Sequence, residues 1–260
     1  MKKKQENAVK KKQENAVKKD NIFKIGAALA AALFVVLCFP LAAVSAGDDI
    51  PEMKVPSDYV LNMATQGQAR NGLYDRFFLK EGLQEVRISL PDENLQYLLM
   101  NAADKVSVLT DKVQIGDETV LYTGLKTKGD YTLAHGVTDN RSNRYSFTIN
   151  FGKYVKKADF GDKQNFFGLR KVSFNNFFFD RSMLKEYTAY YLMHEMNLPA
   201  SQYGLTRLYI NDQYYGVYFM VEAFDYSILE QYYGVKKSKL GKFLAKPLYG
   251  SVTVADQIIS

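Results

Sequence analysis

Residues 168–222 read GLRKVSFNNFFFDRSMLKEYTAYYLMHEMNLPASQYGLTRLYINDQYYGVYFMVE. We expect a strand that leads up to Asn175, then an aromatic patch, then a helix that opens at Asp180. Two further strands, 205–210 and 214–222, follow as a hairpin because the short turn between them is made of residues that tolerate left-handed backbone. This order of strand, helix and hairpin predicts an α+β fold.

The helix in this stretch is expected to run from Asp180 to Met196. Asp180 is placed to accept hydrogen bonds from exposed amide groups as an N-cap. Several large side chains recur at helical spacing (Met183, Tyr187, Tyr190, Tyr191 and His194). The spacing predicts that this helix packs on the sheet, with Tyr187 and Tyr191 buried against it.

Working outward, the pattern of the preceding residues predicts a small sheet. Alternation indicates strands at 86–90 and 144–151, and a hairpin is expected around Gly116-Asp117. Pro91 starts a short helix, because proline is favoured at the beginning of helices. We therefore expect a domain over residues 84–250, with a strongly bent antiparallel sheet and one main packed helix. A tail (251–260) follows it.

The first 83 residues are expected to lie outside that domain. Residues 1–24 contain the octapeptide KKKQENAV twice and form a Lys-rich leader that has nothing to bury. Residues 25–46 are uncharged and apolar and end in small residues, which is typical of a secretory signal cleaved after Ala46. An uncleaved anchor is the alternative, since about 20 apolar residues can span a bilayer. Residues 47–83 are interpreted as a linker.

Charge and cysteine content exclude several functions. The net charge of +6 lies in the first 24 residues, which hold nine lysines against three acidic residues. The rest of the chain is neutral, so it carries no nucleic-acid footprint. The single cysteine, Cys38, would leave with the signal, and the exported chain would then have no disulfide and no cysteine-based metal site.

The common catalytic motifs do not fit this sequence. The stretch from Gly124 to Gly129 has the glycine spacing of a phosphate loop, but Asp130 stands where that loop requires lysine. The predicted architecture instead fits the small lobe of a kinase, where a lysine holds the nucleotide phosphates and a helix glutamate orients that lysine. Lys128, or Lys126 on the same strand face, would pair with Glu186. The plainer alternative is that these lysines are ordinary exposed strand residues.

In order and separation, the motifs from about Pro91 to Tyr249 resemble the CotH family of spore-coat and secreted protein kinases. The matching pieces are Gly124-Leu125-Lys126-Thr127-Lys128-Gly129, Arg144-Tyr145-Ser146-Phe147, Asn175-Asn176 with Asp180 and Glu186, Pro199-Ala200, Tyr209-Ile210-Asn211, and Gly216-Val217-Tyr218 with Glu222.

This resemblance implies a kinase that moves phosphate from ATP, with Mg²⁺ or Mn²⁺, to proteins of a coat or cell surface. It also implies a set of nucleotide-binding residues: Lys126, Lys128, Arg144, Glu186 and Glu222. The family's catalytic and metal-binding aspartates lie beyond an LYK-like segment, which here reads Leu248-Tyr249-Gly250. We therefore assign no catalytic residue and no metal ligand. The chain is expected to be the amino-terminal part of such a kinase, without the large lobe and inactive alone.

A different class of function fits the same residues. The aromatic-rich surface around Phe177-Phe178-Phe179 would serve a non-catalytic coat or surface protein as a docking patch. Exposure of these three rings would favour docking, whereas their burial under a missing lobe would favour a truncated kinase. Carbohydrate adhesion through tyrosine-lined strands has only the composition in its favour.

Overall fold

A computed structural model of the chain describes residues 50–134, 144–155 and 163–234. The expected leader (1–24), the apolar segment (25–46) and the tail (251–260) lie outside the described residues. The described helices and strands all belong to a compact unit that begins at Pro51. Among the described helices, none is long and apolar enough to cross a membrane.

The described strands form one sheet of nine, in the order β2-β5-β6-β7-β9-β8-β1-β3-β4. Their bounds are Leu83–Ser89 (β1), Ser107–Leu109 (β2), Lys112–Ile115 (β3), Glu118–Leu121 (β4), Gly124–Lys128 (β5), Ser146–Asn150 (β6), Lys171–Asn175 (β7), Tyr203–Ile210 (β8) and Gln213–Glu222 (β9). The α-helices are Asp92–Met100 (α2), Lys185–Glu195 (α5) and Tyr226–Tyr233 (α6), and three short 3₁₀ helices precede the sheet at Met63–Thr65 (η1), Ala69–Asn71 (η2) and Asp75–Phe77 (η3). The α+β prediction is confirmed.

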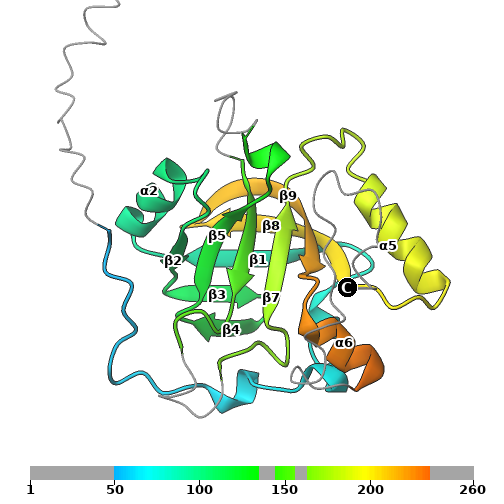
Figure 1. Cartoon of the computed structure of the whole chain (residues 1–260), viewed down its shortest axis with the longest axis horizontal. Coiled ribbons are helices and arrows are strands. Elements are labelled where there is room, and N and C mark those ends of the chain that lie inside the picture. Colours follow the sequence, from blue (N-terminus) through cyan, green and yellow to red (C-terminus); the bar gives the residue numbers. More distant parts are fainter. Residues whose placement is uncertain (1–49, 135–143, 156–162, 235–260) are drawn as a thin grey trace, which may run out of the picture. The chain divides into compact units, whose positions relative to one another are not determined.

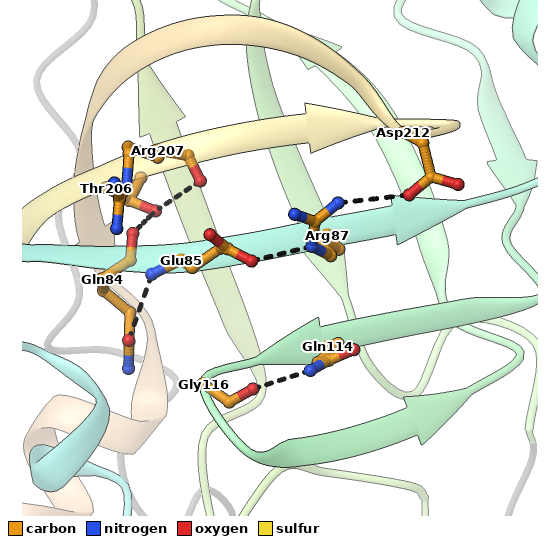
Figure 2. A network of polar contacts seen from close by, with 8 residues as sticks. All are labelled: Gln84, Glu85, Arg87, Gln114, Gly116, Thr206, Arg207 and Asp212. Carbon is orange, nitrogen blue, oxygen red and sulfur yellow. Dashed lines mark hydrogen bonds and ion pairs between the residues drawn. The ribbon is translucent and has the colours of Figure 1, made fainter.

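The sheet is mixed, which corrects the prediction of an antiparallel one. Strand β1 pairs with β8 in parallel, from Leu83 opposite Leu205 to Ile88 opposite Ile210, and with β3 in antiparallel orientation. Polar side chains tie this region together. Arg87 on β1 lies 2.7 Å from Glu85 and 3.2 Å from Asp212 in the β8–β9 turn (Figure 2).

The sheet curls, so that β5 and β7 run across the view of β1, β3 and β4 in Figure 1. Each face of the curled sheet carries its own cluster of buried side chains. The inner face carries the main core, because alternate side chains of the strands point to the same side. This core includes Val86, Ile88, Phe147, Ile149, Val172, Phe174, Leu208 and Met220.

The outer face is covered in part by α5, which lies alongside the sheet (Figure 1). A second, smaller core forms there from Phe177, Tyr203, Phe219 and Val221, with Tyr187 and Tyr190 of α5 packed against it. The prediction that Tyr187 contacts the sheet is confirmed.

Two details of the predicted helix are wrong. The helix begins at Lys185 rather than Asp180, since Met183 has φ of 57°, a left-handed conformation that interrupts the helix before it starts. Tyr191 is 46% exposed, because the residues that face the sheet are Tyr187 and Tyr190, and Tyr191 lies on a neighbouring side of the helix.

The segment interpreted as a linker (47–83) contributes to the core. Leu61, Tyr74, Phe77 and Phe78 are buried, and the Phe77 ring packs 4.6 Å from that of Phe166. The sequence did not indicate this contribution to the core, because the large apolar residues of the segment follow no helical or strand period. Short 3₁₀ helices and extended chain produce no strong period in the sequence.

Candidate functional site

The outer face of β5, β6 and β7 carries a row of polar side chains next to α5. Lys128 on β5 pairs in register with Ser146 on β6. Asn175 at the end of β7 follows Phe174, whose ring lies in the inner core, so the Asn175 side chain points to the outer face. The sheet thus brings residues from three strands to the foot of α5.

Lys128 and Glu186 meet on the side chain of Asn175. The Lys128 ammonium donates to Asn175 Oδ1 at 2.6 Å, and Asn175 Nδ2 donates to Glu186 Oε2 at 2.5 Å. All three side chains are partly buried. The strand lysine and the helix glutamate, which were predicted to pair, are therefore linked through an amide that lies between the two charges.

Asp180 positions the first turn of α5 and hence Glu186. Its carboxylate accepts hydrogen bonds from the Lys185 amide at 2.7 Å and from the Ser182 amide at 3.1 Å. A further hydrogen bond from the Ser182 hydroxyl is the largest of the effects that lower the pKa of Asp180 below its usual value. Asp180 therefore accepts from the first amide of α5, although it lies five residues before the helix and the N-cap position is Leu184 rather than Asp180.

Arg144 lies just before β6 and braces it against β9. Its guanidinium donates to the backbone carbonyl of Val217 and lies 5.1 Å from the ring centre of Tyr218. Its own carbonyl accepts from Asn176 Nδ2 at 2.5 Å. Arg144 thus has a clear structural role besides its predicted contact with phosphate.

A small pocket lies at this end of the sheet. Lys128 and Arg144 both line this pocket, and the Arg144 guanidinium also donates to the Val217 carbonyl. Its lining residues are Lys128, Thr132, Leu133, Arg144, Tyr145, Ser146, Asn176 and Phe178. Two cations beside neutral hydrogen-bonding groups suit an anion such as phosphate.

Lys126 lies one row further along the same face. It pairs in register with Thr148, and the Thr148 hydroxyl lies 3.2 Å from that of Ser173 on β7. Lys126 is exposed, whereas Thr148 and Ser173 are buried. Lys126 therefore shares the outer face with Lys128, as the sequence predicted.

Glu222 lies on the opposite face of the sheet from these residues. It pairs in register with Val172 on β7, a residue of the inner core, and is only 1% exposed. The Tyr74 hydroxyl lies 2.9 Å from Glu222 Oε1, and the backbone N–H of Gln202 donates to Glu222 Oε2 at 3.3 Å. Burial raises the pKa of Glu222 to about 7. The structure therefore does not bring Glu222 together with Lys128 and Glu186.

Two contacts were not expected from the sequence: that of Asn175 with Lys128 and Glu186, and that of Tyr74 with Glu222. Asn175 was noted as part of a motif but not as the link between Lys128 and Glu186, since the link depends on the register of β5, β6 and β7. Tyr74 lay in the supposed linker. Among the described residues, no group of three or more histidine, cysteine, aspartate or glutamate side chains is arranged to hold a metal ion.

Comparison with known proteins identifies the segment that carries this face. Residues 125–248 match the family model described as CotH kinase protein. A search of the curated proteins found no match. The matched segment begins on β5 and includes Lys126, Lys128, Asn175 and Glu186, so the polar outer face is part of a CotH-like region.

Proposed function

We propose, on the premise that residues 125–248 are CotH-like, that this protein binds ATP on the outer face of its sheet and belongs to a phosphate-transfer system acting on coat or surface proteins. The observation that carries the proposal is the meeting of Lys128 and Glu186 on the Asn175 amide. A nucleotide triphosphate needs a fixed cation, and a long lysine side chain is fixed only when a partner holds it.

The chemical setting supports a phosphate ligand at this place. Lys128, Arg144, Ser146 and Asn176 all line one pocket, in which Lys128 is the proposed cation and the Arg144 guanidinium also binds the Val217 carbonyl. Charge-assisted hydrogen bonds of this kind are stronger than neutral ones. In this proposal Lys128 binds the phosphates, Lys126 adds positive charge nearby, and Glu186 acts through Asn175.

The metal ion that the family implies has no ligands that we can assign. Mg²⁺ and Mn²⁺ prefer carboxylate and water oxygens. The described residues provide no cluster of three suitable side chains, so they do not fit a metal held by the protein alone.

Binding of ATP by the full-length chain tests the proposal. Titration calorimetry with ATP and magnesium should give a measurable Kd, and Lys128→Ala should weaken binding by about tenfold or more, as expected for loss of a charge-assisted contact. Lys112→Ala is the matched control, because Lys112 is an exposed lysine on β3 outside the pocket. Equal affinity in both variants, or no binding by the wild type, would contradict the proposal.

Export is proposed on the apolar segment 25–46, which follows the Lys-rich leader. Intact-mass measurement of secreted protein should show a chain that starts at Gly47. A membrane-bound species that retains the KKKQENAV repeat would instead identify an uncleaved anchor.

Docking of another protein is a second candidate function, because aromatic rings are exposed beside the pocket. Phe179 is 59% exposed and its ring lies 4.8 Å from that of Phe178 and 5.5 Å from that of Tyr131. Phe177, by contrast, is buried. If this patch binds a coat or surface protein, Phe179→Ser should reduce retention of the chain in the coat or surface fraction while the Kd for ATP stays unchanged.

A further inference from the structure

The side chain of Asn175 is held by both of its polar ends. Its oxygen accepts from the Lys128 ammonium and its nitrogen donates to the Glu186 carboxylate. The backbone beneath it is fixed as well, since β7 pairs with β6 on one side and with β9 on the other, where Asn175 lies opposite Phe219.

Only one orientation of this amide suits its neighbours. A flipped amide would point its N–H groups at the ammonium and its oxygen at the carboxylate. Both contacts would then be repulsive, because an ammonium only donates hydrogen bonds and an ionised carboxylate only accepts them. The charges of Lys128 and Glu186 therefore set the direction of Asn175, and Asn175 in turn joins the two.

We infer that Asn175 is a positioning residue for the ATP phosphates, which holds the Lys128 ammonium at the pocket and ties it to the first turn of α5 through Glu186. This inference deepens the proposed function and rests on it. A displacement of α5 that carried Glu186 away would release one end of Asn175 and thereby loosen Lys128.

The first test is substitution of Asn175 itself. Asn175→Asp places a second carboxylate where the amide nitrogen now lies 2.5 Å from Glu186 Oε2. The two carboxylates repel each other, and the Kd for ATP should rise about tenfold, the scale of one charge-assisted hydrogen bond. Asn150→Asp is the control, because it adds the same charge to the outer face of the sheet, on β6, away from Lys128, Asn175 and Glu186. It should change the Kd less than threefold by that same scale.

The sharper test exchanges the two groups. In the double variant Asn175→Asp/Glu186→Gln, the carboxylate introduced at position 175 can accept from Lys128 and from the amide introduced at position 186. The total charge is restored and both hydrogen bonds can form again, with the direction of the bond between positions 175 and 186 reversed. The Kd of the double variant should return to within about threefold of the wild type, on the scale used above. A purely structural role for Asn175 predicts no such recovery. If Asn175→Asp does not fold by circular dichroism, Asn175→Ala takes its place as the single variant.

A second measurement does not depend on ATP. The ¹⁵N–¹H signal of the Lys128 ammonium, assigned by its loss in Lys128→Arg, reports directly on the contact with position 175. It should shift in Asn175→Ala and return toward its wild-type position in the double variant. This result would show that Asn175 holds the Lys128 ammonium even if the wild type bound no ATP, an outcome that would refute the proposed function. An unchanged Lys128 signal in Asn175→Ala, or a Kd that is the same in all variants, would overturn the inference.

Discussion

Glu222 forms the end of a buried chain of hydrogen bonds on the inner face of the sheet. The Tyr74 hydroxyl lies 2.9 Å from Glu222 Oε1 and 2.8 Å from Gln231 Oε1, and Gln231 Nε2 donates to Asp75 at 3.2 Å. A hydroxyl has one proton and can donate to only one of its two neighbours. A protonated Glu222 resolves this, since it donates to Tyr74, which is then free to donate to Gln231.

The raised pKa of Glu222 predicts how stability depends on pH. The folded protein holds this proton up to about pH 7, whereas an unfolded glutamate releases it near pH 4.5. The native state therefore binds more protons between these values, and stability falls as the pH rises through them, by about 3 kcal/mol in total. Glu222→Gln, which mimics the protonated acid, should remove this decline.

Urea unfolding at pH 5 and at pH 8 measures the effect. The difference in unfolding free energy between the two pH values should shrink in Glu222→Gln by about 3 kcal/mol. Glu93→Gln, an exposed glutamate on α2, should leave the difference unchanged. An unaltered pH dependence in Glu222→Gln would mean that Glu222 is ionised in the folded protein.

Gly216 on β9 is required by both its backbone and its surroundings. Its φ is 126°, and an added Cβ would lie 3.1 Å from Arg144 Cζ. Gly216→Ala should therefore destabilise the protein by about 2–3 kcal/mol, as strain and crowding add. Gly82→Ala also forces a residue into positive φ but meets nothing within 4 Å, so it should cost about 1 kcal/mol. Chemical unfolding measures the free energy of unfolding of both variants. An equal decrease in the two would show that the Arg144 side chain moves aside at little cost.

At the scale of the element, α5 is attached to the sheet by a few aromatic contacts. Tyr190 packs 5.8 Å from the ring of Tyr203 and 5.6 Å from that of Phe219. His194 joins them, since its Nε2 lies 3.0 Å from the Ser201 carbonyl oxygen. No residue of α5 is fully buried, so its position depends on these contacts.

Two adjacent tyrosines of α5 should respond very differently to truncation. Tyr190→Ala removes two ring contacts and should destabilise the protein by about 2–3 kcal/mol, somewhat below the cost of removing a fully buried aromatic. Tyr191→Ala removes an exposed ring and should stay within about 0.5 kcal/mol of the wild type. Unfolding curves for the two variants measure both values, and a reversed order would place the wrong side of α5 on the sheet.

Elements with strong local signals were predictable from the sequence. Asn211 and Asp212 both adopt positive φ in the β8–β9 turn, as their side chains allow. The α6 helix ends at Gly234 in the left-handed conformation, again a local choice. The parallel pairing of β1 with β8 could not be predicted in this way, because it joins strands far apart in the sequence, and no turn sets their register.

The charged residues of the candidate site could be predicted from the sequence, but the residue that connects them could not. Lys128 and Glu186 follow from the chemistry of phosphate binding, whereas Asn175 enters through the register of three strands. Tyr191 was wrongly predicted to be buried, because large side chains cover more of the helix surface than the side that contacts the sheet. Glu222 was placed among the nucleotide-binding residues by the resemblance alone, and its local sequence does not indicate the contact with Tyr74.

At the scale of the whole molecule, the segment before β1 completes the inner core. The Phe77 ring packs 4.6 Å from Phe166 and 5.3 Å from Phe167, and the Arg76 guanidinium lies over both Phe77 and Phe167. Gln231 of α6 contacts Asp75 of the same segment. The segment therefore holds together parts of the chain that are distant in sequence.

Truncating a ring in this segment should have a large effect. Phe77→Ala should destabilise the protein by about 4 kcal/mol, a large share of the stability of an ordinary domain. Leu73→Ala, in the same segment but 47% exposed, should cost less than about 1 kcal/mol. Thermal unfolding distinguishes the two, and similar melting temperatures for both variants would restore the interpretation of this segment as a linker.

The parallel pairing of β1 with β8 also dictates when this protein can fold. Strand β1 lies between β8 and β3, so the ladder that joins β1 to β8 cannot form until β8 has left the ribosome. Contacts between such distant segments form slowly, because a long loop must close before they are made. Strand β1 therefore stays without its parallel partner while the chain is being synthesised, so completion of the sheet is a late step of folding.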